Sequence, residues 1–419
     1  MNKTKEVCKI LFRYIKIFLK WSFIAIVIGV IGGITGTVFH KCLDFVTDFR
    51  IDNTYITYFM PLGIIVIIAM YSIFEKNEKL DTNLVIRSVK EEEKIPVILV
   101  PLIFFGTVIT QLFGGSAGRE GAALQIGGGI GFNFGRLLKL NKTEIHIVTM
   151  AGMSSVFSAL FATPVTAAIF SLEVISVGEF NFTGLLPCLL ASVTAYYISS
   201  LLGVSGMSVP AITIDGISAV MIAKVILLAI CCAIISIAFC FAIKKSKHFI
   251  NRYIKNPYLR GFVAALIVVL LTVASRTFDY NGAGINIVER ALSGEARSYD
   301  FIMKIIFTAI TIAAGFKGGE IVPAFFVGAT FGCVMGPAFG IESGLAAAIG
   351  MVAVFCGAVN CPITSIILSV ELFGAKGIAL FAVACAVSYI MSGRAGLYKN
   401  QSILYSKLTA EAVTDGDGL

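Results

Sequence analysis

VFSALFATPVTAAIFSLEV, residues 156–174, has a counterpart in VFCGAVNCPITSIILSVEL, residues 354–372. Aligning the prolines of the two stretches also aligns their glutamates, Glu173 with Glu371. Apolar segments share residues through composition alone, but a proline and a glutamate at the same spacing in two places indicate a duplication. The sequence therefore predicts two related halves joined in tandem.

A second pair of matching stretches lies upstream of the first. GGSAGREGAALQIGGGIG (114–131) and AGFKGGEIVPAFFVGATFG (314–332) are both glycine-rich, and each carries one glutamate, Glu120 or Glu320. Interrupted apolar segments at corresponding places of two halves are typical of a transporter's binding site. Irregular backbone at membrane depth is tolerated only inside protein or beside a polar cavity. We therefore expect the two loops to meet near the middle of a membrane.

The composition is that of an integral membrane protein. Of the 419 residues, 57% are hydrophobic and only 14% are charged, whereas about a quarter of a soluble domain is charged. Apolar runs long enough to cross a bilayer recur along the chain, and we predict an all-α membrane protein. The clear runs cover 21–39, 56–74, 95–113, 182–202, 216–243, 261–275, 301–315 and 376–392.

Basic residues predict how the chain is oriented. They gather before the first span and in one middle loop, at Lys244, Lys245, Lys247, Arg252, Lys255 and Arg260, and the positive-inside rule places both segments in the cytoplasm. The net charge of +8 thus reflects loops of a multi-pass inner (plasma) membrane protein rather than a nucleic-acid surface. The predicted parts are a basic N-terminal segment 1–20, a first membrane repeat 21–205, a connecting helix and basic loop 206–260, a second repeat 261–398 and a short tail 399–419.

Several classes of chemistry lack support in the sequence. The ten cysteines form no CxxC pairs, and most lie in apolar segments as small hydrophobic residues. His40, His146 and His248 show no metal-ligand spacing, so we predict neither metal nor cofactor. No nucleophile–base pair points to an enzyme. The 114–131 loop also lacks the GxxxxGK[ST] pattern of a nucleotide-binding loop.

The two glycine loops have the chemistry of an anion site. Glycines before a helix leave backbone N–H groups free, and the helix N-terminus adds partial positive charge. Glu120 beside such a site could occupy it when ionised and leave it when protonated, which would couple anion passage to protons. The alternative is a structural ion pair between Arg119 and Glu120, although adjacent helix residues point in different directions.

At these residues the sequence resembles the CLC family of chloride channels and proton-coupled anion antiporters. GREG (118–121), GGEIVP (318–323), the two proline segments and GRAGLY (393–398) occur in the family's order. The resemblance implies an inverted repeat of broken, tilted helices and a homodimer with two pores. It also implies that Glu120 is the external gating glutamate. The anion-binding residues it implies are Gly118, Arg119, Gly121, Gly318, Gly319, Ile321, Val322 and Tyr398.

Departures from the family pattern resemble its bacterial fluoride/proton antiporter branch. KLDTN (79–83) stands where the family has GSGIP, which places Leu80 near the chloride-coordinating serine. Val174 occupies the position of the internal proton glutamate, and Glu320 occupies a position that is usually apolar. One feature differs from that branch as well, because Val322 stands where a threonine is common.

A second protonatable carboxyl also suits fluoride on physical grounds. Fluoride is strongly hydrated, and a hydrogen bond from protonated Glu320 could offset its dehydration; the alternative is an ion pair of Glu320 with Lys317. We predict a proton-coupled fluoride antiporter that exports F⁻ in exchange for H⁺. A chloride/proton antiporter and a passive anion channel are the alternatives.

Four other residues are expected to be structural rather than part of the ion path. We expect Glu173 and Glu371 to accept structural hydrogen bonds, and Phe325 and Phe326 to pack in the core.

Overall fold

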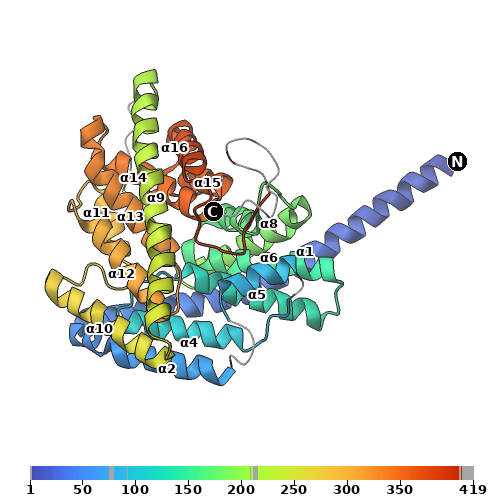
Figure 1. Cartoon of the computed structure of the whole chain (residues 1–419). Coiled ribbons are helices and arrows are strands. Elements are labelled where there is room, and N and C mark those ends of the chain that lie inside the picture. Colours follow the sequence, from blue (N-terminus) through green and yellow to red (C-terminus); the bar gives the residue numbers. More distant parts are fainter. Residues whose placement is uncertain are drawn as a thin grey trace.

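The computed structural model is an assembly of helices (Figure 1). It describes residues 2–74, 80–91, 93–207, 209–210, 216–404 and 407, so part of the predicted 206–260 connection, most of the 399–419 tail and Lys79 of KLDTN lie outside the described residues. The α-helices are α1 (Asn2–Asp52), α2 (Met60–Phe74), α3 (Thr82–Lys90), α4 (Leu99–Leu112), α5 (Glu120–Leu137), α6 (Lys142–Phe161), α7 (Pro164–Glu173), α8 (Leu185–Leu201), α9 (Ala219–Tyr253), α10 (Pro257–Ser275), α11 (Ile285–Leu292), α12 (Asp300–Ala314), α13 (Ile321–Met335), α14 (Ser343–Val359), α15 (Pro362–Phe373) and α16 (Ile378–Met391).

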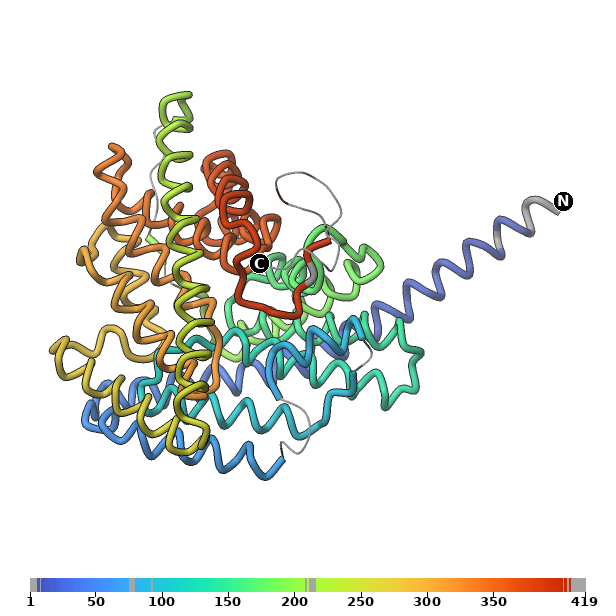
Figure 2. Tube along the Cα trace, in the orientation of Figure 1, coloured from blue at the N-terminus to red at the C-terminus, as the bar shows by residue number. Residues whose placement is uncertain are grey.

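Short elements complete the described chain. They are the 3-10 turns η1 (Thr54–Phe59), η2 (Phe182–Gly184), η3 (Pro337–Phe339) and η4 (Ala375–Gly377), and the two-residue strands β1 (Ser176–Val177) and β2 (Ser402–Ile403). The strands pair in parallel and join the end of α7 to the segment after α16. Figure 2 shows this C-terminal segment returning across the molecule from the second half toward the first.

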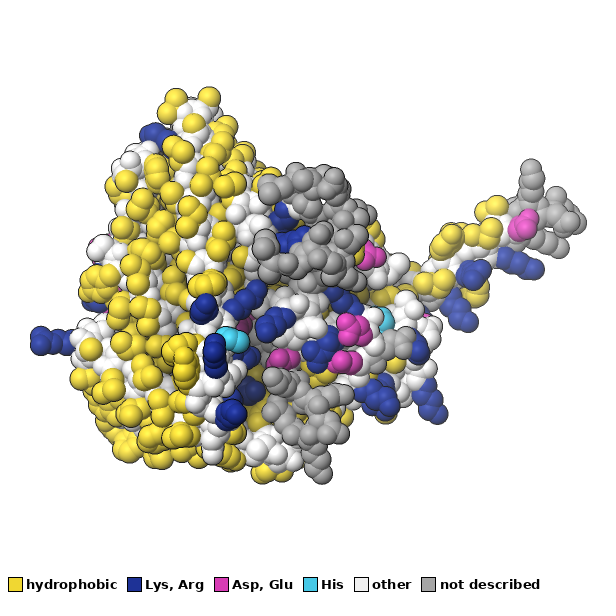
Figure 3. Space-filling model, in the orientation of Figure 1, with side chains coloured by type: hydrophobic (Ala, Val, Ile, Leu, Met, Phe, Trp, Pro, Cys, Tyr) yellow, Lys and Arg dark blue, Asp and Glu magenta, His cyan; other side chains and the backbone are white. Residues whose placement is uncertain are grey.

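Six helices in the described part of the chain are long and apolar enough to cross a membrane. Shorter apolar helices, among them α7, α13 and α15, have 10–15 residues, fewer than a helix needs to cross a bilayer alone. Figure 3 shows hydrophobic side chains over most of one face, while Lys and Arg side chains gather in a smaller area beside it. The predicted all-α membrane architecture with broken helices is therefore confirmed.

The same packing scheme occurs in each half. α1 packs against α6 and α8, and α9 packs against α14 and α16. α5 crosses α6 through glycines, because a Cβ on Gly127 would overlap the carbonyl oxygen of Gly152. A Cβ on Gly328 of α13 would likewise overlap the carbonyl oxygen of Gly350 in α14. These close crossings, typical of membrane helices with small residues, hold the start of α5 and of α13 at matching places.

The duplicated proline segments interlock the two halves. Pro164 and Pro362 begin α7 and α15, a position where proline's missing N–H is unused. Glu173, at the end of α7, accepts hydrogen bonds from the backbone N–H groups of Ile363 (3.0 Å) and Thr364 (2.8 Å) at the start of α15. Glu371 accepts the equivalent pair from Val165 (2.9 Å) and Thr166 (2.8 Å). Each half thus caps a helix of the other.

Candidate anion-binding site

The two glycine loops pair directly with each other. The Gly118 N–H donates to the Gly319 carbonyl at 2.7 Å, and the Gly319 N–H donates to the Gly118 carbonyl at 2.9 Å. The result is an isolated antiparallel bridge between segments about 200 positions apart in the sequence. This bridge places the N-termini of α5 and α13 side by side, as the sequence predicted for a shared site.

Glycine is required on both sides of the bridge. Gly318 has φ +154°, a conformation that side chains rarely adopt, and a Cβ there would lie 2.7 Å from the Gly118 carbonyl oxygen. A Cβ on Gly118 or Gly319 would overlap the carboxylate of Glu120. Gly121 lies equally close, since its Cβ would lie 2.9 Å from the Gly318 carbonyl oxygen. The loops can approach only because these positions have no side chains.

Glu120 from the first half reaches the helix start of the second. Its Oε1 accepts a 2.7 Å hydrogen bond from the backbone N–H of Val322, in the first turn of α13. The residue is completely buried, and its Oε2 has no hydrogen-bond partner among the described residues. The carboxylate therefore occupies the place where a free helix N-terminus binds an anion.

Arg119 points away from Glu120. Its guanidinium lies 2.6 Å from His40 Nδ1 and 3.4 Å from Asp44 Oδ1 on α1, and it covers the ring of Phe161. No ion pair joins Arg119 to Glu120 among the described residues. The different directions expected of adjacent residues are observed, and the Arg119 guanidinium contacts α1 rather than the Glu120 carboxylate.

The second loop contacts the Glu120 carboxylate through Gly319 and Val322. Ile321 is completely buried, and Val322 is nearly so. Glu320 directly precedes α13 and is partly accessible, so its carboxyl lies beside the same helix N-terminus as Glu120. The Lys317 ammonium lies 3.7 Å from the centre of the Tyr71 ring. Glu320 is therefore the residue before the helix whose first turn binds the Glu120 carboxylate, although its own side chain makes no capping hydrogen bond.

Tyr398 lies beside the two glutamates, and Leu80 lies two residues before Thr82, whose hydroxyl approaches Gly121. Tyr398 is buried and lies close enough to Glu320 and Glu120 to interact with both electrostatically. The Leu397 N–H donates to the Ala358 carbonyl at 2.9 Å, which fixes the segment that carries Tyr398. Leu80 is buried just before Asp81, whose carboxylate caps α3 by accepting from the Leu84 N–H at 3.1 Å.

Sequence reasoning missed two polar groups beside these residues. The Thr82 hydroxyl accepts a 2.9 Å hydrogen bond from Gln125 Nε2, and it lies 3.3 Å from the position of a Cβ on Gly121. Gln125 lies within the first glycine stretch, GREGAALQ, one helical turn beyond the loop. The position of Gln125 could therefore have been predicted from its spacing in the sequence. The position of Thr82 could not, because it depends on how α3 packs.

Other predicted positions belong to the packed interior. Val174 is completely buried. Phe325 makes an edge contact with Phe355 at 5.1 Å between ring centres, and Phe326 is buried against Tyr280. Phe325 and Phe326 therefore form part of the aromatic core.

Residues 62–393 match the sequence profile of the family described as voltage gated chloride channel. The chain belongs to this family. A chloride/fluoride channel protein of Pseudomonas syringae pv. tomato is 31% identical over 401 residues, covering 93% of this chain and 87% of the relative. A proton/chloride exchange transporter of Vibrio cholerae is 23% identical over 388 residues, covering 84% of this chain and 81% of the relative.

Solved structures of family members share the fold. The crystal structure of a CLC-type fluoride/proton antiporter has a TM-score of 0.89 and 33% identity, covering 92% of this chain and 98% of that one. A slow cyanobacterial chloride/proton antiporter has a TM-score of 0.78 at 19% identity, covering 89% of this chain and 94% of that one. The inverted repeat of broken helices implied by the CLC resemblance is therefore the architecture of this chain.

Proposed function

We propose that this protein is a proton-coupled fluoride antiporter that exports F⁻ in exchange for H⁺. The observation that carries the proposal is the hydrogen bond from the Val322 N–H to the Glu120 carboxylate. An acidic side chain that fills an anion site must leave before an anion can enter, and protonation weakens its hold there. Anion movement and proton movement then share one residue.

The choice of fluoride rests on the second carboxyl and on the relatives. Glu320 lies beside the α13 N-terminus, and when protonated it donates an O–H hydrogen bond to an arriving anion. Charge-assisted bonds of this kind are about twice as strong as neutral ones, and they favour fluoride because it is small and strongly hydrated. The relatives named for fluoride are 31% and 33% identical, whereas those named for chloride exchange are 23% and 19% identical.

The roles of the other residues follow from their positions. The N–H groups at the start of α13 bind the anion once Glu120 has left, with Tyr398 and Leu80 closing the opposite side. Gly118, Gly121, Gly318 and Gly319 keep the loops close enough for both halves to contact one ion. The guanidinium of Arg119 acts outside the central site, beside Asp44.

Orientation and assembly form a further part of the proposal. The basic residues before the first span, at the end of α9 and at the start of α10 support an N-terminus in the cytoplasm of a cell's inner membrane. The CLC resemblance supports a homodimer in which each copy has its own pore, surrounded by lipid. Chloride/proton exchange and passive anion conduction are the alternatives that the experiment must separate.

The test is flux from liposomes that contain the purified protein. Fluoride release and internal pH are recorded together, first with fluoride inside and then with chloride. We expect fluoride release with opposite proton movement, and we expect Glu120→Gln to abolish the coupling. Glu295→Gln removes the charge of an exposed carboxyl and serves as the matched control, with unchanged coupling.

Each other outcome supports a different function. Fluoride release without proton movement identifies a channel in which Glu120 only gates. Chloride transported as fast as fluoride identifies a chloride/proton antiporter or a chloride channel, and removes the assignment to fluoride. Transport of neither anion contradicts the proposal altogether.

A further inference from the structure

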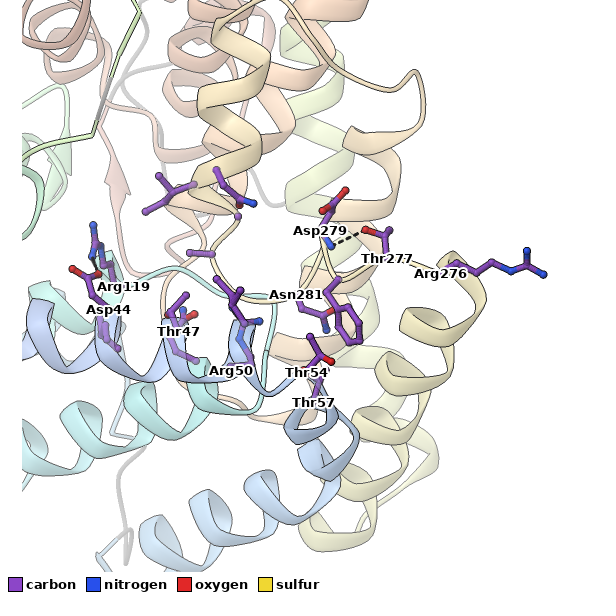
Figure 4. Close-up of a pocket in the computed structure, with 18 residues that line it drawn as sticks. Asp44, Thr47, Arg50, Thr54, Thr57, Arg119, Arg276, Thr277, Asp279 and Asn281 are labelled. Atoms are coloured by element: carbon purple, nitrogen blue, oxygen red, sulfur yellow. Dashed lines mark hydrogen bonds and ion pairs between the residues drawn. The ribbon is translucent and has the colours of Figure 1, made fainter.

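A hollow of about 580 Å³ lies beside the central site but does not include Glu120. Its walls come from the end of α1, from η1 and from the loop between α10 and α11 (Figure 4). The basic segments lie before the first span of α1 and ahead of α10, whereas the hollow lies at the opposite ends of these helices. α10 has 19 residues, or about 28 Å of helix at 1.5 Å per residue. The hollow therefore faces the side opposite the basic loops.

Arg50 is a buried cation without a counter-ion in the wall of this hollow. It is 8% exposed, and its Nε has no hydrogen-bond partner among the residues that the structure describes. No carboxylate within the described ranges lies within ion-pair distance of it. Its terminal nitrogens lie 3.0 Å from a Cβ placed on Gly114 and 2.8 Å from one placed on Gly282, so these two glycines make room for the guanidinium.

Lys304 is a second buried cation on the far side of Gly282. Its ammonium donates to the carbonyls of Gly282 (2.8 Å) and Tyr280 (3.2 Å), and it faces the ring of Phe326 at 5.0 Å. Asp300, one turn earlier on α12, accepts instead from the Tyr280 hydroxyl at 2.7 Å. Gly282 thus separates two like charges, neither of which forms an ion pair with a carboxylate of the described chain.

The acidic residues that line the hollow are already paired. Asp44 contacts His40 at 3.1 Å and Arg119 at 3.4 Å, and Asp279 contacts Arg297 at 3.1 Å. The local charge balance is therefore positive. Burying unpaired charges of one sign is unfavourable, and a bound anion would neutralise it.

Further hydrogen-bond donors face the same space. Thr57 is 1% exposed, and its hydroxyl lies 3.3 Å from the Gly114 Cβ position that also contacts Arg50. Within the described part of the chain, neither this hydroxyl nor Arg119 Nε, at the opposite wall, has a hydrogen-bond partner. Buried polar groups normally have partners. Three unpartnered donors around one hollow therefore indicate a missing ligand that accepts hydrogen bonds.

We propose that this hollow is an outer docking site for a halide ion, bound by the Arg50 guanidinium and the Thr57 hydroxyl. The anion keeps part of its water, since a liquid water occupies about 30 Å³ and the hollow is many times larger. A hydrated halide is recognised by charge more than by size, so this site accepts fluoride, chloride and bromide alike. Lys304 adds positive potential from behind Gly282. Discrimination between halides then belongs to the loops at Glu120.

Bromide provides a direct test because its anomalous X-ray scattering locates it in a crystal. Crystals of the full-length protein soaked in bromide should show a peak in the hollow beside Arg50. Arg50→Gln should remove the peak, and Thr57→Val should weaken it. Arg252→Gln is the matched control, because Arg252 is exposed in the last turn of α9 and does not line the hollow. No peak in the wild type, or an equal peak in Arg50→Gln, would overturn the proposal.

A flux measurement tests the same site in the membrane. Arg50→Gln should raise the outside halide concentration for half-maximal exchange by roughly tenfold, the loss of one hydrogen bond to a charged group. If Arg50→Gln does not fold, Thr57→Val provides the test, and we expect a smaller increase in the half-maximal halide concentration. An unchanged half-maximal concentration in the folded variant contradicts the proposal. The bromide peak should persist in Glu120→Gln, so this result is independent of proton coupling and of the transported anion.

Discussion

Glu120 and Arg119 are neighbours in the chain, yet their side chains enter different compartments of the molecule. Glu120 reaches the N-terminus of α13, while Arg119 contacts α1 and lines the outer hollow. The separation matters because an arginine beside Glu120 would hold its carboxylate ionised. Without that cation, the carboxylate is stabilised mainly by backbone N–H groups, which an anion can also use.

Glu320 provides the sharpest prediction at the residue scale. Glu320→Gln keeps the size of the side chain but removes the proton that an acid exchanges. We expect fluoride/proton exchange to slow by about tenfold or more, the loss of one hydrogen bond to a charged group. The assay is the liposome flux described above, with Glu295→Gln as control. A Glu320→Gln variant that exchanges at the wild-type rate would assign Glu320 to packing.

The residues of the central site and those of the outer hollow differ in how far the sequence could predict them. Glu120 and Glu320 lie in glycine-rich loops that precede helices, and this local pattern is enough to indicate an anion site. Arg50 and Lys304 lie at the end of α1 and within α12, where nothing local distinguishes them from interfacial cations. Gly114 and Gly282 make room for Arg50, and Lys304 donates to the Gly282 carbonyl. Both environments are built from segments far apart in the sequence.

At the element scale, the reciprocal capping of α7 and α15 makes the two halves mutually dependent. A carboxylate at a helix N-terminus satisfies two otherwise unpaired N–H groups and interacts favourably with the helix dipole. The nine-residue spacing of proline and glutamate was therefore a structural signal, as the duplicated pattern indicated. The repeated pattern could not predict which helix each glutamate caps, because each glutamate caps a helix of the other half.

Glutamine substitutions should show which of the two capping glutamates contributes more to stability. Glu173 accepts a third bond from the Thr364 hydroxyl at 2.6 Å and is only 6% exposed, whereas Glu371 accepts two and is less buried. A glutamine offers one acceptor oxygen and places an NH₂ group against a backbone donor. We expect Glu173→Gln to lower stability by about 1–3 kcal/mol, and Glu371→Gln by less. Thermal unfolding midpoints in detergent measure both losses of stability. A larger loss in Glu371→Gln than in Glu173→Gln would contradict the prediction.

At the scale of the whole molecule, the segment after α16 joins the second half back to the first. Leu404 continues the pairing of β2 with β1 by donating to the Val177 carbonyl at 3.1 Å, and Lys90 of α3 donates to the Asn400 carbonyl at 2.9 Å. Lys407 donates to Asn360 Oδ1 at 2.5 Å and to Ser392 Oγ at 3.1 Å. The sequence alone showed a short polar tail, and only the fold shows that its beginning is anchored.

Lys407 makes this anchoring sensitive to pH. Burial lowers the pKa of its ammonium from 10.5 to about 8. Between these values the unfolded chain binds more protons than the folded one, so stability rises with pH. Relative to Lys407→Met, which cannot titrate, wild-type protein should gain thermal stability between pH 8 and pH 10. A midpoint difference that stays constant over this interval would show that the amine is freely solvated.

The reciprocal caps also set an order of events during biosynthesis. The acceptor for the Val165 N–H is Glu371, which is 206 positions later in the chain. At a synthesis rate of about 5–20 residues per second, the first half waits roughly 10–40 s for it. During that interval the start of α7 already lies in the insertion machinery or the bilayer with two amides unsatisfied. A nascent chain stalled before Glu371 would therefore be recognisable to membrane quality control by a polar helix end that only the finished protein covers.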